Sequence, residues 1–580
     1  MVKHMEKKLQ NLDQEQLKNI ILEMKKTLTE EQYKKLELLV QEYVTDDADY
    51  KEKYMQQRMS QEFVNEKMSL IKKWMQQIDN GEVCLNIEEY EDYSDNYWDR
   101  DWIVEYYDNQ GIGDKILSMI QFAKDCVDDR RYQEANEIYE WLWSTSVWTD
   151  SEYDSEPVDL EMLEENDVIR TDMRQLALLT LYTDYQVQEP NNRAEDLYLY
   201  FSYSTFKKLH IEDMFYVGRE NLTEKEQFWN DWIALLQTKN GDVESRLLKE
   251  AVFNRYGIEG LLKIADENSD IHPSLYLSVM DEYAKKHDYE QIEKVGAKAV
   301  EKISKRFKIR SQVALKAAYA SSCLMNEENV MKFCWEAFRS DMTVRNFLRL
   351  FAIEEMAEQY GIKGGTLLPS ILQSDYISYE RNEELRQNVL GTIDYYTLCF
   401  YTGNFEKAKG ASKNPQGSLG WSGTFMPYGI RLFLLYLYEK TLPSKAAEAL
   451  ARYVGFPDET DNSNRINFEN EIIEESQRNK TSVFWNYFQR WKSYFSISFE
   501  EKKKYLTWAE KIVYSRADAL VSKQRRNHYC EAAELLAMVA EIKEDMGIQE
   551  ARRIVFAEYK RKFPRHSSFQ AEMKNYFGMI

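Results

Sequence analysis

Apolar residues recur at helical spacing along most of the chain. In 9–44 they lie three or four positions apart in two runs, which predicts an antiparallel pair of helices. Thr29 followed by Gln32 is a capping-box pattern at the start of the second run. The same periodicity continues through 49–78 and 115–143. With only 9 prolines and 21 glycines in 580 residues, the chain is expected to consist of long helices with short connections.

The stretch Gly403–Lys440 interrupts this pattern with a glycine-rich loop. A strongly apolar run follows the loop and predicts a helix at the buried centre of the array. The loop 417–423 permits a phosphate-binding interpretation, but it lacks the Gly-Lys-Ser/Thr ending of a P-loop. In the structural alternative, Gly420 allows a tight return of the chain and Trp421 fills the interior. The six glycines are Gly403, Gly410, Gly417, Gly420, Gly423 and Gly429.

These patterns predict an all-α fold, an α-solenoid of antiparallel helix pairs. A change of direction is expected near 361–370, where glycines cluster again. Five segments are predicted: an N-terminal helical segment, residues 1–80; an acidic aromatic region with a first helix pair, 81–168; a repeat array, 169–375; a glycine-rich central segment, 376–455; and a C-terminal helical region with a basic surface, 456–580.

A repeated motif supports the helix pairs. In 115–143, the turn Arg131-Tyr132-Gln133-Glu134 is followed by a small residue, Ala135, and then by Tyr139. Similar positions recur later at Ile292, Val330 and Ala408, which are 38 and then 78 residues apart. This pattern resembles the tetratricopeptide family in degenerate form, and the resemblance implies stacked helix pairs with these residues at the helix crossings.

A second resemblance concerns the C-terminal end. The stretch 525–577 and the Leu-Gly-Trp-Ser at 419–422 are similar to bacterial helical proteins that carry a SWIM-type zinc finger. The finger itself needs closely spaced cysteines and a Cys-x-His pair, which this sequence lacks. The resemblance therefore implies helical architecture and no zinc site.

Acidic residues give the chain a formal charge of −23 and concentrate in two tracts, 88–108 and 150–167. We interpret the tracts as a docking surface for a basic protein or peptide. Two alternatives remain: a solvated linker, or an acidic helix face with its aromatic residues turned inward. The candidate contacts are the acids Glu88, Glu89, Glu91 and Asp92 and the aromatic anchors Tyr97, Trp98 and Trp102.

Basic residues concentrate near the C-terminus, with Arg525, Arg526, Arg561 and Arg565 as candidate anion-binding residues. This surface would bind RNA or an acidic partner, pair head-to-tail with the chain's own acidic region, or be an ordinary helical surface. The overall negative charge makes a general nucleic-acid-coating role the less favoured interpretation.

Other features limit the chemistry. The six cysteines form no CxxC pair, and no apolar run approaches the length of a membrane span, so we expect a reduced, cytoplasmic protein without membrane segments. No metal site, cofactor site or catalytic constellation is recognisable; His528 and Cys530 stand alone as possible ligands.

The favoured function is a non-enzymatic scaffold that binds a protein or peptide. The alternative is a regulator that binds a nucleotide or nucleic acid through 417–423 or the C-terminal helices. The oligomeric state stays open.

Overall fold

The computed structural model describes residues 59–96, 99–150, 157–351, 392–413, 417–455 and 482–578. It divides into two compact units, of which the first ends at Gly257 and the second begins at Ile258. This boundary lies inside helix α13 (Asp242–Glu267), where Gly257 leaves helical geometry with φ 63° and ψ −159°. The helix pair predicted in 9–44 and the change of direction predicted near 361–370 lie outside the described residues.

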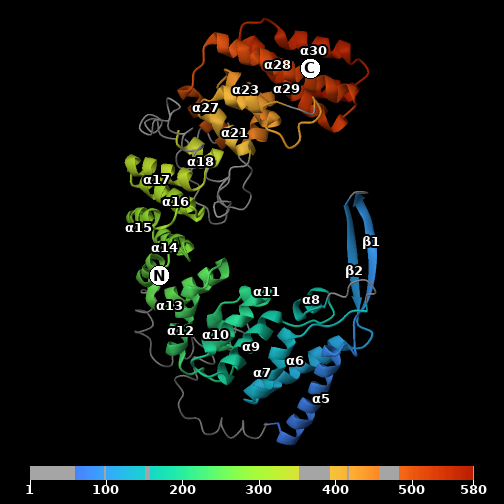
Figure 1. Cartoon of the computed structure of the whole chain (residues 1–580), viewed down its shortest axis with the longest axis vertical. Coiled ribbons are helices and arrows are strands. Elements are labelled where there is room, and N and C mark those ends of the chain that lie inside the picture. The colour runs from blue at the N-terminus through green and yellow to red at the C-terminus, as the bar shows by residue number, and fades with distance from the viewer. Residues whose placement is uncertain are drawn as a thin grey trace, which may run out of the picture. The chain divides into compact units, whose positions relative to one another are not determined.

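The first unit consists of helices and one antiparallel ribbon (Figure 1). Helix α7 packs against both α6 and α9 and so joins the helices of this unit. Besides the start of α13, its elements are α5 (Gln61–Asp79), β1 (Asn86–Asn96), β2 (Asp99–Tyr107), α6 (Ile112–Asp128), α7 (Tyr132–Ser144), α8 (Leu160–Glu165), α9 (Met173–Val187), α10 (Arg193–Leu199), η1 (Tyr200–Ser202), α11 (Ser204–Lys207), η2 (Ile211–Tyr216) and α12 (Lys225–Thr238).

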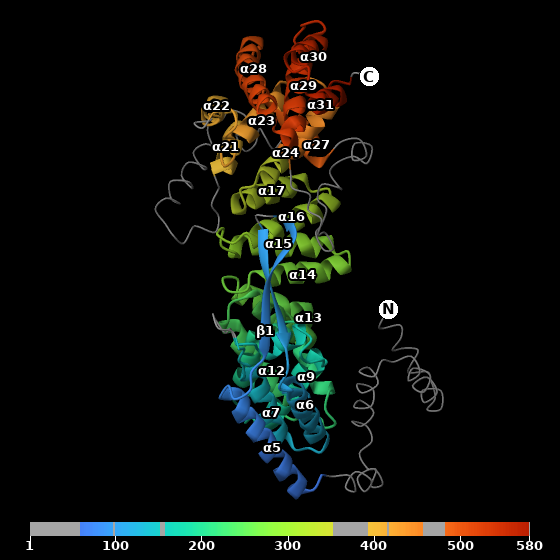
Figure 2. The same ribbon diagram turned by 90° about the vertical axis from the view of Figure 1, so that its right-hand side faces the viewer.

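All secondary-structure elements among the described residues of the second unit are helices. Its first four complete helices, α14 to α17, stack in chain order side by side (Figure 2). The elements are α14 (Ser274–Lys285), α15 (Tyr289–Lys302), α16 (Ile309–Cys323), α17 (Glu327–Ser340), α18 (Val344–Arg349), α21 (Thr392–Tyr401), α22 (Phe405–Ala411), α23 (Met426–Leu437), α24 (Lys445–Val454), α27 (Val483–Tyr494), α28 (Phe499–Ser522), η4 (Arg526–His528), α29 (Tyr529–Asp545), α30 (Ala551–Lys562) and α31 (Ser567–Phe577). The predicted all-α array of helix pairs is confirmed.

The same turn joins the two helices in four pairs, one in the first unit and three in the second: α6–α7, α14–α15, α16–α17 and α21–α22. A residue with left-handed backbone geometry stands two positions after the end of the first helix. The amide of the following residue donates to the carbonyl five residues earlier, which is the Schellman arrangement that satisfies helix-end carbonyls. The second helix begins two residues after the left-handed residue. The left-handed residues and their φ angles are Arg130 (63°), His287 (54°), Met325 (56°) and Gly403 (81°).

The predicted crossing residues occupy equivalent places in these pairs. Each is the fourth residue of its helix and lies five positions after the left-handed residue. Asp288, Asn326 and Asn404 cap three of the four helices by accepting a hydrogen bond from the third helical amide. The crossing residues are Ala135, Ile292, Val330 and Ala408, and their side chains are 0, 0, 3 and 0% exposed.

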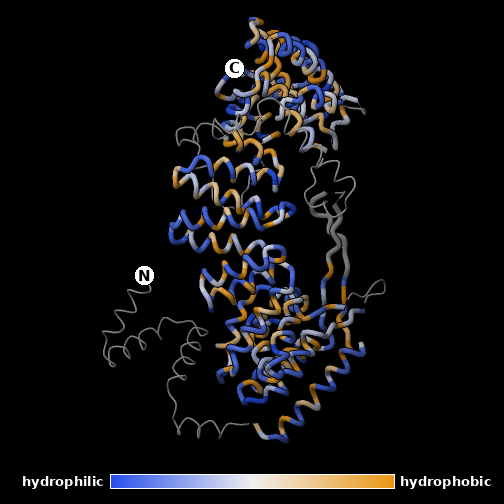
Figure 3. Tube along the Cα trace, turned by 60° about the vertical axis from the view of Figure 1, so that its left-hand side comes forward, coloured by the Kyte–Doolittle hydropathy of each residue, from blue (hydrophilic) through white to orange (hydrophobic). Residues whose placement is uncertain are grey.

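Helix α23 forms the centre of the packing in the C-terminal portion of the second unit. Every residue of α23 except Tyr428 is buried, and the helix contacts α21, α22, α24, α28 and α29. Full burial of an aliphatic side chain contributes about 1.5–3 kcal/mol, so this apolar run stabilises the helices around it. Along the described helices, orange apolar and blue polar positions alternate, as Figure 3 shows. No helix within the described ranges is long and apolar enough to cross a bilayer.

The acidic tract 88–108 differs from both structural alternatives expected for it. It is neither a linker nor a helix face, because β1 and β2 pair as an antiparallel two-stranded ribbon. The ribbon is the only sheet among the described residues, and Figure 1 shows it standing clear of the helices of the first unit. Aromatic and β-branched residues favour strands, and Trp102, Ile103, Val104, Tyr106 and Tyr107 outweigh the acidic composition that obscures this signal.

Candidate functional site

The strand register places acidic residues directly opposite one another across the ribbon. Glu88 is paired with Glu105, and four residues further along β1, Asp92 is paired with Asp101. Because side chains alternate between the faces of a strand, these four residues belong to one face. Like charges placed directly opposite destabilise a strand pair. This face therefore holds a concentration of negative charge, which we call the acidic ribbon face.

The base of the ribbon is fixed to the core of the first unit. Leu85 is fully buried and forms a parallel bridge with Thr149. Asp150 then accepts hydrogen bonds from the Ile87 amide (3.0 Å) and from Nδ2 of Asn86 (2.5 Å). These two bonds, with the Asn86 bond the larger effect, lower the pKa of Asp150 below its ordinary value. The ribbon therefore leaves the helices in a defined direction.

Exposed apolar groups surround this base. Trp148 is 45% exposed, Tyr107 40% and Val104 37%. The Tyr107 hydroxyl donates to Oε2 of Glu105 at 2.6 Å, which places an aromatic ring beside the acidic pair at 88 and 105. An exposed aromatic group next to carboxylates matches a cationic side chain, because arginine and lysine interact with both.

The structure describes only some of the predicted contact set on the ribbon. The Glu88 side chain is exposed, and Glu89, Glu91 and Asp92 lie on β1. Trp102 lies on β2 opposite Glu91. Tyr97 and Trp98 lie outside the described residues. Sequence reasoning missed Trp148; the available signal was a tryptophan two positions before the second acidic tract.

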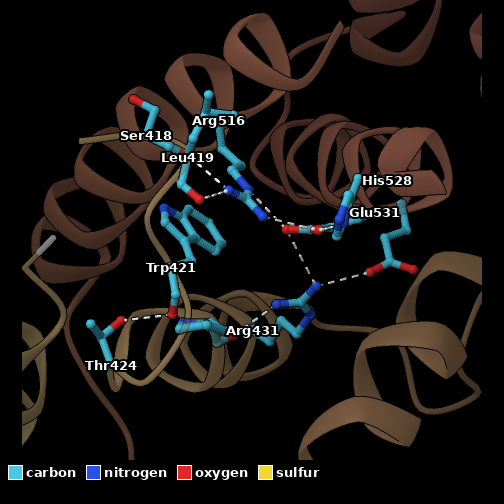
Figure 4. Close-up of polar contacts among 10 residues, drawn as sticks. Ser418, Leu419, Trp421, Thr424, Arg431, Arg516, His528 and Glu531 are labelled. Carbon is cyan, nitrogen blue, oxygen red and sulfur yellow. Dashed lines mark hydrogen bonds and ion pairs between the residues drawn. The ribbon is translucent and has the colours of Figure 1, made fainter. Parts of the chain in front are cut away.

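A second charged site lies beneath the glycine-rich loop and is buried (Figure 4). Arg516 of α28 donates to the carbonyls of Ser418 and Leu419, both at 2.9 Å. It also makes a bidentate pair with Glu531 of α29, at 3.0 and 3.2 Å. Its guanidinium lies 4.6 Å from the ring centre of Trp421, which is 3% exposed. The loop is thus held to two helices by one arginine.

Arg431 of α23 continues this buried cluster. Its Nη2 donates to Oε1 of Glu534 at 3.3 Å and lies 3.9 Å from Oε1 of Glu531. Its Nη1 donates to the Pro427 carbonyl at 3.0 Å, and the guanidinium stacks 3.9 Å from the Tyr453 ring centre. Two arginines therefore face two glutamates, and we call these four residues the buried Arg–Glu cluster.

The two glutamates of the cluster respond differently to burial. Burial alone raises the pKa of each carboxyl group. In Glu531, hydrogen bonds and charge from Arg516, together with the charge of Arg431, reverse that effect and lower the pKa below its ordinary value. In Glu534, burial dominates over Arg431, and the pKa is raised.

The geometry of the loop does not favour the phosphate-binding interpretation. A phosphate cradle uses backbone N–H groups. At Ser418 and Leu419 the loop instead directs carbonyl oxygens at Arg516, and that arginine is also paired with Glu531. Gly420 lies between these carbonyls and Trp421 and is partly buried.

A third charged surface lies at one end of helices α28 to α31. Tyr529, at the start of α29, has its ring 6.4 Å from His566, just before α31, and Lys562 of α30 pairs with Asp518 of α28 at 2.5 Å. These contacts bring the α28–α29 and α30–α31 turns together. All four predicted arginines are exposed and lie at or beside these turns, and we call them the basic end: Arg525, Arg526, Arg561 and Arg565.

The described residues contain no group of three or more His, Cys, Asp or Glu side chains that could hold a metal ion. His528 and Cys530 do not belong to such a group: Nδ1 of His528 contacts Glu531 at 3.1 Å, and Sγ of Cys530 contacts the Tyr576 hydroxyl at 3.0 Å.

The chain matches no family model, no curated protein and no solved structure at a significant level.

Proposed function

We propose that this chain is a non-enzymatic helical-repeat scaffold that binds a basic protein or peptide segment on its acidic ribbon. The observation that carries the proposal is the ribbon itself, a sheet element with eight acids and one arginine in 86–107, set on a helical body. The helices position the ribbon and the ribbon makes the contact.

The chemistry of the ribbon favours an extended basic partner. Exposed strand edges bind extended peptides through main-chain hydrogen bonds. Alternate side chains of the bound peptide then lie on the same face as alternate side chains of the strand. The outward amide of Ile87 is already taken by Asp150, so the free length of the β1 edge begins at Glu89. Arginines at alternate positions of a partner strand would meet the acid pairs 88/105 and 92/101, while Trp148 and Tyr107 flank the base.

Fluorescence anisotropy with a short labelled peptide that alternates arginine and threonine tests this proposal. We expect Glu88→Lys with Glu105→Lys to weaken binding at least about tenfold, which is about 1.4 kcal/mol. Trp148→Ala should weaken it less. Binding should also decline as added salt screens the charges.

The matched control is Glu189→Lys with Glu195→Lys, which makes the same charge change at two exposed acids elsewhere in the first unit. It should leave the affinity within about twofold, because these two acids lie at α10 and not on the ribbon. Equal loss in both double variants would show that net charge alone attracts the peptide. That result would refute the ribbon as the binding site.

The alternative function, nucleotide or nucleic-acid binding, retains one supporting observation, the four exposed arginines of the basic end. The carbonyl groups that 417–423 directs at Arg516 give that loop no comparable support.

A further inference from the structure

The basic end is a concentration of positive charge within an acidic chain. The four arginine side chains make no hydrogen bond or ion pair to any residue that the structure describes. Helices α28 to α31, from Phe499 to Gly578, contain sixteen lysines and arginines against twelve acids, whereas the whole chain carries −23. The basic end is therefore a local concentration of positive charge on a chain that is negative overall, and an anionic partner would complement it.

The dimensions of the patch favour a short acidic partner over a long polyanion. Duplex DNA carries one charge about every 1.7 Å, so a bound duplex would extend past four arginines and meet the acidic remainder of the surface. A short acidic element would pair with the arginines and end there. Arginine also binds carboxylates in bidentate geometry, which suits protein acids.

The chain itself presents such an element. The acidic ribbon face has acidic residues at two pairs of positions in the strand register, 88/105 and 92/101, which are four residues apart along β1, or about 13 Å. The basic end likewise presents two arginine pairs, 525/526 beside one turn and 561/565 beside the next. An arginine of a partner placed beside either pair of acidic positions would form charge-assisted hydrogen bonds there.

We infer that the acidic ribbon of one copy binds the basic end of a second copy. This inference rests on the proposed function and names its partner: the basic segment that the ribbon takes is supplied by another molecule of the same chain. The contact is heterologous, since different surfaces meet, so it extends into a head-to-tail chain or closes into a ring.

Sedimentation velocity of the full chain tests the inference. At about 0.1 M salt, where charges interact over about 10 Å, the average mass should rise with protein concentration beyond a dimer. At about 1 M salt, where that distance is about 3 Å, the chain should be monomeric. Neutralising the basic end should weaken association at least about tenfold, and neutralising the ribbon face should do the same.

Two quadruple variants make the test specific. The first carries Arg525→Ala, Arg526→Ala, Arg561→Ala and Arg565→Ala. The second carries Glu88→Gln, Asp92→Asn, Asp101→Asn and Glu105→Gln. Each should be monomeric alone. Mixed, they retain one complementary contact per pair, so the mixture should form a 1:1 complex and no larger species.

The control removes four other positive charges from the same helices by Lys503→Ala, Lys511→Ala, Arg553→Ala and Lys574→Ala, all at exposed positions. It should associate like the unmodified chain. Circular dichroism and the melting temperature show whether each variant is folded.

Two outcomes overturn the inference: an unmodified chain that stays monomeric up to about 100 µM at low salt, or a mixture that stays monomeric. If the monomeric chain binds a labelled oligouridine and the arginine variant does not, the basic end is a nucleic-acid interface. If the monomeric chain still binds the arginine–threonine peptide through Glu88 and Glu105, the proposed function stands and only the self-association is lost. If it binds neither itself nor the peptide, both proposals are lost.

Discussion

Carboxylates are exposed to solvent in the acidic ribbon and buried in the Arg–Glu cluster. In the ribbon, Glu88 and Glu105 face each other in solvent, whereas in the cluster Glu531 and Glu534 are buried against two arginines. Two charges 4 Å apart interact by about 1 kcal/mol in water and about 4 kcal/mol at an effective dielectric constant of 20. The ribbon can therefore tolerate two acids directly opposite each other at low cost. The cluster cannot tolerate an unbalanced charge, and its charges are balanced within the fold.

The largest effect expected from this comparison comes from unbalancing the cluster. Glu531→Ala removes the carboxylate that both arginines face and leaves Arg516, which is 6% exposed, with an uncompensated charge. Breaking a buried pair in this way costs about 3–5 kcal/mol. Urea unfolding monitored by tryptophan fluorescence measures the loss.

The matched change on the ribbon is Glu88→Ala, which removes an exposed acid of the same type. It should alter the free energy of unfolding by no more than about 0.5 kcal/mol. If the two variants lost equal stability, burial would not distinguish the two sites and the comparison would fail.

The next effect is a pH dependence of opposite sign at the two buried glutamates. The pKa of Glu531 is lowered in the folded state, so its contribution to stability is present above the ordinary value of 4.5 and lost as pH falls through the lower folded pKa. The pKa of Glu534 is raised, so stability is gained as pH falls through its folded pKa towards 4.5.

The variants Glu531→Gln and Glu534→Gln separate these contributions. Relative to the unmodified chain, Glu531→Gln should lose most stability at neutral pH and least in acid below the ordinary glutamate range. Glu534→Gln should remove the gain on mild acidification. Urea unfolding across this pH range measures both differences, and parallel profiles for the two variants would contradict the assignment.

The helix pairs were predictable because their signals are local. Asp288, Asn326 and Asn404 are capping residues, and each stands four positions before its crossing residue, so one short window contains the turn, the cap and the buried position. The cluster was not predictable in this way, because Arg431 and Glu534 are 103 residues apart. Its only sequence signal was a single arginine inside a strongly apolar helix.

The ribbon was not predicted from the sequence, for a different reason. Eight acids in 86–107 are typical of solvated segments, and acidic residues are depleted in strands. The alternation that places Glu88 and Glu105 on one face becomes visible only once the register is known. In the ribbon, local propensity and final structure therefore disagree, which is the pattern that functional sites often show.

The smallest effect tests whether the acid pair on the ribbon is unfavourable in the free chain. Glu88→Lys places a cation opposite Glu105, and converting a like-charged cross-strand pair to an oppositely charged one should stabilise the ribbon by about 0.2–1 kcal/mol. The amide of Ile87 points away from β2, so the amides at 88 and 105 point across the ribbon. Amide hydrogen exchange at 88 and 105 therefore measures the effect, and Glu195→Lys on α10 serves as the control. The protection should decrease at about 1 M salt, where screening weakens the new pair. Slower exchange that is insensitive to salt would instead indicate packing by the longer lysine side chain. The same substitution is expected to stabilise the free ribbon and to weaken binding, because the repulsion that it relieves is the one that a basic partner would otherwise neutralise.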